Sequence, residues 1–274
     1  MPAGIPGRRP WGPTTVLPRT RPDLHPAPRA RGPRTVGAGR GGSVEPMPEP
    51  LTPATGLAVL HLFCVAAPDA DRAAVVAAVE EARAAEVQVV PVAVLGHKAD
   101  VGFMAVGADL WTLRRLQTAI AAAGLLVADS YVSLTELSEY AEGLPEKMAE
   151  ARLRPQLPPP GRNAFCFYPM SKRREPGQNW YELPFDDRRD LMYEHGATGR
   201  TFAGRIVQLI TGSTGIDDWE WGVTLFGERP DDLKEVVYTM RYDRASARYA
   251  EFGPFVTGAV GTLDEVLDAA GFVG

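Results

Sequence analysis

The sequence predicts an α+β fold, a dimeric α+β barrel made of two ferredoxin-like repeats. Residues 51–143 alternate extended and helical patterns in the order βαββαβ, and residues 163–274 repeat that order. Two such halves can set their sheets side by side as one barrel-like unit. The strongest internal match is a strand followed by a helix that begins with an aspartate. In the first half these are 101–106 and 109–122, and in the second half 219–226 and 231–241.

The first half contains four apolar runs and two segments with apolar residues at helical spacing. Asp69 suits the start of the first helix, which is rich in alanine. The second helix has Trp111, Leu113, Leu116 and Ile120 on one face. We therefore expect strands at 57–65, 87–95, 101–106 and 125–134, and helices at 69–85 and 109–122.

The second half repeats this plan after a proline-rich segment, 144–162, which we interpret as a linker. Its first helix should start at Pro184 and end at His195, with Gly196 as the C-terminal cap. This places His195 on the last helical turn. The expected strands are 164–168, 204–211, 219–226 and 254–260, and the expected helices are 184–195 and 231–241.

Composition excludes several classes of protein. The chain has 274 residues, 45% of them hydrophobic, which is ample for a packed core. No apolar run is long enough to span a bilayer, so we expect no membrane insertion. Cys64 and Cys166 lie far apart without CxxC spacing, which indicates two buried thiols in a reducing cytoplasm rather than a disulfide or a zinc site.

Charge is unevenly distributed along the chain. Residues 1–50 carry eight arginines, three acidic residues and 12 of the 25 prolines, with almost no apolar periodicity, so we expect a disordered tail. The remaining residues have a net charge of −10. An acidic folded part argues against a nucleic-acid surface, although a basic turn at Lys172–Arg174 could form a local anion site.

His195 is the histidine with the most suggestive neighbours. Tyr168 ends the preceding strand and Gln208 lies on the following one. No serine nucleophile elbow or Walker loop occurs. The residues alone leave two interpretations open: a structural histidine beside a solvated basic turn, or a haem-type site with one histidine ligand.

Several short sequence motifs occur together in this chain. YPMSK at 168–172, the His-Gly at 195–196 and the QxITGS strand at 208–213 occur together, and this joint occurrence is specific. The chain resembles the chlorite dismutase-like superfamily and, within it, the coproheme decarboxylases of Firmicutes, over roughly residues 56–261. The full set of strings is GHKADVGFM (96–104), SYVSLTELSEY (130–140), CFYPMSKRR (166–174), NWYELP (179–184), EHGATGR (194–200), QLITGSTGIDDWEWGVTLF (208–226) and MRYDRASARYAEFGPF (240–255).

The resemblance implies a cytoplasmic enzyme, usually a homopentamer. It would convert iron coproporphyrin III (coproheme) to haem b by oxidatively decarboxylating two propionates to vinyl groups with hydrogen peroxide. Coproheme is then both substrate and redox centre. Two alternatives stay open: a chlorite dismutase or haem peroxidase, and a non-catalytic haem-binding protein.

The resemblance also assigns roles to residues. It makes His195 the iron ligand, Tyr168 the radical-forming residue and Lys172 the partner of a propionate that assists the second step. Chlorite dismutases have an arginine where this chain has Gln208. The implied cofactor-binding set is Arg152, Tyr168, Met170, Ser171, Lys172, Gln208 and Ser246.

Two points of that assignment stay open. The loop before Tyr168 is about two residues longer than the family's, so Arg154 rivals Arg152 as the propionate contact. Arg244 occupies a position that is acidic in related proteins, which leaves the partner of His195 undefined.

Overall fold

The computed structural model of the chain describes residues 48–141 and 143–272. The expected disordered tail, residues 1–50, lies outside these ranges except for its last three residues. No helix among the described residues is long and apolar enough to cross a membrane.

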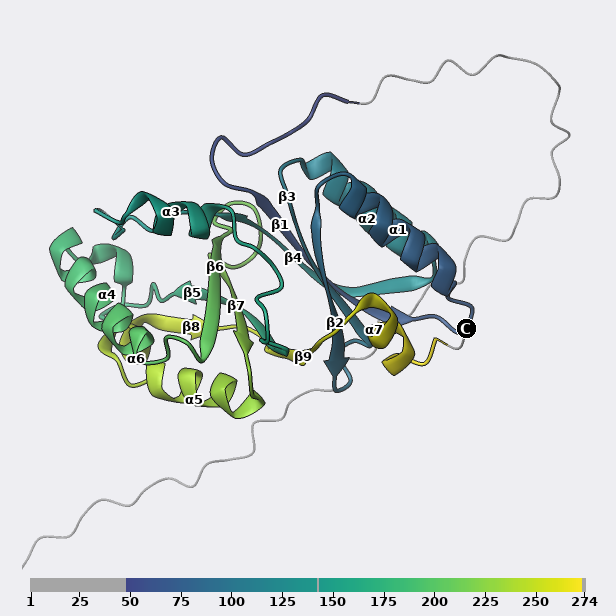
Figure 1. The fold of residues 1–274 in the computed structure, drawn as a ribbon. Coiled ribbons are helices and arrows are strands. Elements are labelled where there is room, and N and C mark those ends of the chain that lie inside the picture. Colours follow the sequence, from purple (N-terminus) through teal and green to yellow (C-terminus); the bar gives the residue numbers. More distant parts are fainter. Residues whose placement is uncertain (1–47, 142, 273–274) are drawn as a thin grey trace, which may run out of the picture. The chain divides into compact units, whose positions relative to one another are not determined.

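The first half has the predicted βαββαβ order. Its strands are fully antiparallel and lie in the order β4-β1-β3-β2. Helices α1 and α2 lie side by side (Figure 1), and they cover one face of these strands with an aliphatic core. The elements are β1 (Ala58–Ala66), α1 (Arg72–Ala84), β2 (Gln88–Leu95), β3 (Val101–Gly107), α2 (Leu110–Ala122) and β4 (Leu125–Thr135).

The second half repeats the order with additions that the sequence analysis did not predict. The 144–162 segment contains a helix, α3 (Glu146–Leu153), and two short elements, α6 and β8, precede the last strand. The elements are β5 (Ala164–Lys172), a 3-10 turn η1 (Trp180–Glu182), α4 (Phe185–Arg200), β6 (Ile206–Gly212), β7 (Trp221–Gly227), α5 (Pro230–Met240), α6 (Arg244–Tyr249), β8 (Ala250–Phe252), β9 (Val256–Val260) and α7 (Leu263–Ala269).

The two sheets join at both edges. β4 pairs with β6 through Leu134↔Gly212 and Thr135↔Thr211, and β2 pairs with β9 from Val92↔Val260 to Leu95↔Thr257. β9 also pairs with β5, and β5 with β7, so the ladder returns to its start. The eight long strands therefore form a closed antiparallel barrel, in which each of them has a neighbour on both sides.

The barrel interior is aromatic and encloses His61. Its ring stacks on Phe167 at 4.2 Å between centroids, and Nε2 lies 3.0 Å from Thr224 Oγ1. Burial lowers the pKa of His61 to about 3, so this histidine is neutral at physiological pH. His61 is a structural core residue.

Helix α4 runs further than the sequence analysis predicted. Gly196 was expected to cap it, but the helix continues through Gly196 to Arg200. A helical glycine costs about 1 kcal/mol relative to alanine, which a packed helix tolerates. The positive φ that favours glycine occurs instead at Gly204, with φ 84°, after the helix has ended.

Two glycine substitutions should have opposite effects on stability. A Cβ at Gly258 in β9 would overlap the Ala93 carbonyl oxygen of β2. We expect Gly258→Ala to lower the free energy of unfolding by about 2 kcal/mol. Gly199→Ala in α4 meets only Met240 Cε at 3.9 Å and should raise it by about 0.5–1 kcal/mol. Urea denaturation measures both, and an unchanged Gly258→Ala protein would contradict the close approach of β9 to β2.

Candidate functional site

The outer face of the second-half sheet brings together most of the predicted site residues. Side chains alternate along β5, so Phe165 and Phe167 enter the barrel while Tyr168, Met170 and Lys172 face outward. The outward face is covered by α5 and contributes to a small apolar cluster that includes Tyr168 and Met170.

β6 adds Gln208 and Ile210 to this face. Across β7, Gln208 is aligned with Leu225 and then Cys166, whereas Ile210 is aligned with Val223 and then Tyr168. Ile210 is 44% exposed, which is unusual for an aliphatic strand residue on a helix-covered face. The face therefore has an open apolar area on the β6 side of Tyr168.

His195 is oriented by a buried carboxylate. Its Nδ1 lies 3.1 Å from Asp243 Oδ2 and 3.4 Å from Ser246 Oγ. The other oxygen of Asp243 accepts the Ser246 amide at 2.9 Å and caps α6. Because Asp243 engages Nδ1, Nε2 is the ring nitrogen left to bind a ligand.

Asp243 stays ionised although it is buried. Burial would raise its pKa, but hydrogen bonds from His195 and from the Ser246 amide lower it below the usual value. Asp243 is thus the acidic partner that the sequence analysis left undefined. Arg244 pairs instead with Glu194 on the surface, with Nε 2.7 Å from Oε2.

Lys172 is a nearly buried cation. Only 9% of the residue is exposed, and Nζ lies 4.2 Å from the centroid of the Trp180 ring. Burial lowers the pKa of Lys172 to about 8, while the carboxylates of Asp243 and Glu220 act in the opposite direction. A lysine with this pKa can hold an anion or exchange a proton near neutral pH.

Tyr168 lies in an aromatic cluster with residues from the end of β8 and the segment just before β9. Its ring stacks on Phe255 at 4.4 Å and meets Phe252 edge-on at 5.6 Å. Burial raises the pKa of Tyr168, so the phenol keeps its proton at neutral pH. Any oxidation of this ring therefore requires the proton to leave with the electron.

The remaining predicted residues are less closely associated with His195. Ser171 points to the other face of β5, where its Oγ accepts the Glu220 amide at 3.2 Å. Arg152 and Arg154 are both exposed at the end of α3, and Arg154 bonds to Glu150. The geometry does not favour either arginine.

Three residues near His195 and Lys172 were not assigned a role from the sequence: Trp180, Glu220 and Asp243. A signal for Asp243 was available, because an aspartate three residues before Ser246 has the spacing of a helix cap. Glu220 and Trp180 carry no such local signal, since their contacts depend on the meeting of β5, β7 and η1.

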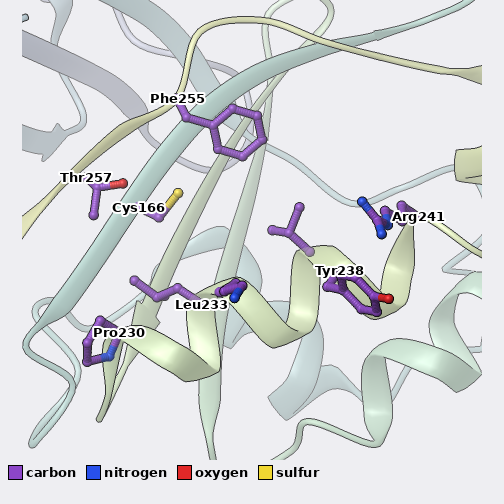
Figure 2. Close-up of a pocket in the computed structure, with 9 residues that line it drawn as sticks. Cys166, Pro230, Leu233, Tyr238, Arg241, Phe255 and Thr257 are labelled. Atoms are coloured by element: carbon purple, nitrogen blue, oxygen red, sulfur yellow. The ribbon is translucent and has the colours of Figure 1, made fainter.

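A separate cavity of about 450 Å³ lies between α5 and strands β5 and β9. Figure 2 shows Cys166 and Thr257 on the strand side, with Leu233, Tyr238 and Arg241 along the helix. None of the predicted site residues lines this cavity. Phe255 connects the two regions, because it lines the cavity and stacks on Tyr168.

Comparisons with known proteins agree with this fold. A family model described as chlorite dismutase matches residues 70–261. The coproheme decarboxylase of Staphylococcus carnosus is 43% identical over 179 residues, which cover 61% of this chain and 70% of the relative. A protein of Natronomonas pharaonis, named as a candidate haem-binding protein, is 43% identical over 182 residues, which cover 60% of this chain but only 30% of that relative.

One solved structure shares both fold and sequence similarity. It is described as a novel haem-binding protein from Thermus thermophilus, and it superposes with a TM-score of 0.73 at 36% identity. The match covers 80% of this chain and 96% of that protein.

The depressed pKa of Lys172 predicts a specific pH dependence of stability. Between about pH 8 and pH 10.5 the folded state has lost a proton that the unfolded state keeps, so unfolding takes up a proton. The free energy of unfolding should rise with pH across this window, by up to about 3 kcal/mol from this group. Lys172→Met should lack this rise.

Urea denaturation of the two proteins at a series of pH values measures the difference. Lys147→Met, at an exposed position in α3, is the control and should follow the wild-type curve. A Lys172→Met curve parallel to the wild-type curve would contradict a desolvated Lys172.

Proposed function

Because the chain belongs to the chlorite dismutase family, we propose that it acts as a coproheme decarboxylase. The substrate would be iron coproporphyrin III and the product haem b. At each of two propionates, one hydrogen peroxide would accept two electrons and two protons, giving a vinyl group, carbon dioxide and two waters. The observation that carries the proposal is a carboxylate-oriented histidine on α4 together with a desolvated lysine and a buried tyrosine on the outward face of β5.

The residues present fit an iron porphyrin with four carboxylates. His195 would hold the iron through Nε2, with Nδ1 held by Asp243. The exposed Ile210 offers apolar area for a macrocycle. Lys172 offers a cation for a propionate, and Ser246 and either Arg152 or Arg154 would add further contacts.

Coproheme, once bound, supplies the redox chemistry that passes substrate electrons to peroxide. Asp243 would keep the His195 ring in one orientation and raise its basicity as a ligand. Tyr168, which burial keeps protonated at rest, would first lose its phenolic hydrogen as one electron and one proton, and the resulting tyrosyl radical would then take a hydrogen atom from a propionate side chain. Lys172 would hold the carboxylate being lost and exchange protons with it.

Gln208 separates this proposal from chlorite dismutation. A neutral amide can donate a hydrogen bond to peroxide but lacks the permanent charge of the arginine that chlorite dismutases have there. A haem-binding protein without catalysis is the second alternative, and two relatives are named for haem binding alone. Such a protein would have no use for a buried lysine and a buried tyrosine on the same face of β5.

The proposal extends to the state of the protein in the cell. It includes a homopentamer in the cytoplasm and a dispensable segment at residues 1–50. Met170 would contact the substrate from the outward face of β5, and Ser171, whose side chain points to the other face, would do so through its backbone. Light scattering after gel filtration would test the pentamer directly.

The decisive experiment loads the purified protein with coproheme, titrates it with peroxide and follows the products by mass. We expect stepwise conversion to haem b and no sustained oxygen release when chlorite replaces peroxide. His195→Ala is the control, which should bind coproheme weakly and lose the histidine-ligated iron spectrum. Rapid oxygen evolution from chlorite would favour a dismutase, and coproheme that binds but stays unconverted would favour a carrier.

Tyr168→Phe should retain coproheme binding and lose formation of both vinyl groups. The phenylalanine preserves the ring contacts with Phe255 and Phe252 but has no phenolic hydrogen to transfer. Tyr238→Phe, half-exposed on α5, is the matched control and should convert coproheme at the wild-type rate. Haem b formation by Tyr168→Phe at the wild-type rate would exclude Tyr168 from the reaction.

A further inference from the structure

Glu220 is a buried carboxylate that contacts the end of β5 from the residue before β7. It is 6% exposed, and Oε2 accepts the backbone amide of Lys172 at 2.8 Å. Oε1 accepts a hydrogen bond from the Arg174 guanidinium. The amide of Glu220 itself donates to the Met170 carbonyl and to Ser171 Oγ, each at 3.2 Å. Glu220 thus engages each residue from Met170 to Lys172.

The Lys172 amide needs this partner because the β5–β7 ladder has already ended. The last paired residues are Met170 and Trp221. Successive amides of a strand point to opposite sides, and the next amide, that of Arg173, donates to the Tyr249 carbonyl at 2.7 Å on the β8 side. The Lys172 amide therefore faces the β7 side, where the Glu220 side chain replaces the missing strand carbonyl.

The same carboxylate influences η1. Burial and the neighbouring Glu220 carboxylate raise the pKa of Tyr181, and the Arg174 guanidinium lies 4.9 Å from the Tyr181 ring centroid. Trp180, the preceding residue, carries the Lys172 ammonium above its ring. Glu220 is therefore in contact with both the backbone that bears Lys172 and the segment on which the ammonium rests.

The charges around the Lys172 ammonium also involve Glu220. The ammonium of Lys172 is faced by the Trp180 ring from η1, by Asp243 from the start of α6 and by Glu220 from the start of β7. Asp243 already bonds to His195 and Ser246, so its charge is shared. Glu220 bonds to Arg174 and to the Lys172 amide, so its charge is shared as well, and it acts on the Lys172 ammonium in addition to the larger effect of Asp243.

We propose that Glu220 is a positioning residue for Lys172, which fixes the end of β5 and stabilises the ammonium above Trp180. The part of this inference that concerns substrate rests on the proposed function, because Lys172 is expected to meet a propionate there. The effect of Glu220 on Lys172 itself does not depend on any substrate.

The test is Glu220→Gln in the full chain without coproheme. Competitive labelling with trace acetic anhydride, read by mass spectrometry, gives the pKa of each lysine. We expect the pKa of Lys172 to fall by about 1 when the facing charge is removed. Lys98, Lys147 and Lys234 serve as internal references and should not change. With coproheme, the variant should bind more weakly than wild type near neutral pH, and the difference should close at about pH 6, where Lys172 is protonated in both proteins.

Two further variants separate charge from fold. Glu251→Gln removes the same charge from an exposed position opposite Ser171 and should leave the labelling curve of Lys172 unchanged. Glu220→Asp keeps the charge but shortens the side chain. In this variant the pKa of Lys172 should stay close to the wild-type value, while the free energy of unfolding should fall. Glu220→Asp replaces Glu220→Gln if that variant does not fold.

Two results would overturn the inference. One is a Glu220→Gln protein that melts earlier but has a wild-type labelling curve, because a purely structural role predicts only the first effect. The other is a fall in the pKa of Lys172 in Glu220→Asp as large as in Glu220→Gln. A wild-type protein that fails to convert coproheme would reject the proposed function and leave the labelling result valid.

Discussion

The contact between Asp243 and His195 is the interaction on which the candidate site depends. Asp243 caps α6 with one oxygen and orients His195 with the other, and its charge also acts on Lys172. A helix cap, a ligand orientation and a counter-charge therefore share one buried carboxylate. Removing it would disturb all three at once, so the position of the histidine and the charge of the lysine cannot vary independently.

Sequence periodicity was sufficient for the order of the eight long strands and of the two main helices in each half, but not for the short added elements or for how the halves join. The βαββαβ pattern of residues 51–143 and its repetition follow from local hydrophobic spacing, as does the helix that carries His195. The pairings of β4 with β6 and of β2 with β9 depend on strands far apart in sequence, and no local pattern specifies them. The helical segment α3 was hidden for a different reason: prolines surround it, and its own apolar pattern is weak.

In the candidate site, too, some residues could be predicted from the sequence and others could not. Tyr168, Lys172 and His195 are distinctive because they belong to a recognisable motif set, although β5 and α4 run further than predicted and place Tyr168 and His195 inside these elements. Glu220 and Asp243 look like surface acids in a chain with 34 acidic residues, and only the fold reveals that both are buried. Residues that act by positioning another residue are harder to predict from sequence, because acidic residues are common along the chain and only the folded position of these two distinguishes them.

The double pairing of β9 has a consequence for how the protein folds. β9 is the last strand along the chain, yet it lies between β2 and β5 and supplies the segment that packs on Tyr168. Until β9 docks, two strands keep an open edge and the aromatic surroundings of Tyr168 are incomplete. The chain must bring together residues more than 160 positions apart to fill this gap, which favours slow, cooperative folding over independent folding of the halves. During synthesis, the site would thus be completed only after nearly all of the barrel has left the ribosome.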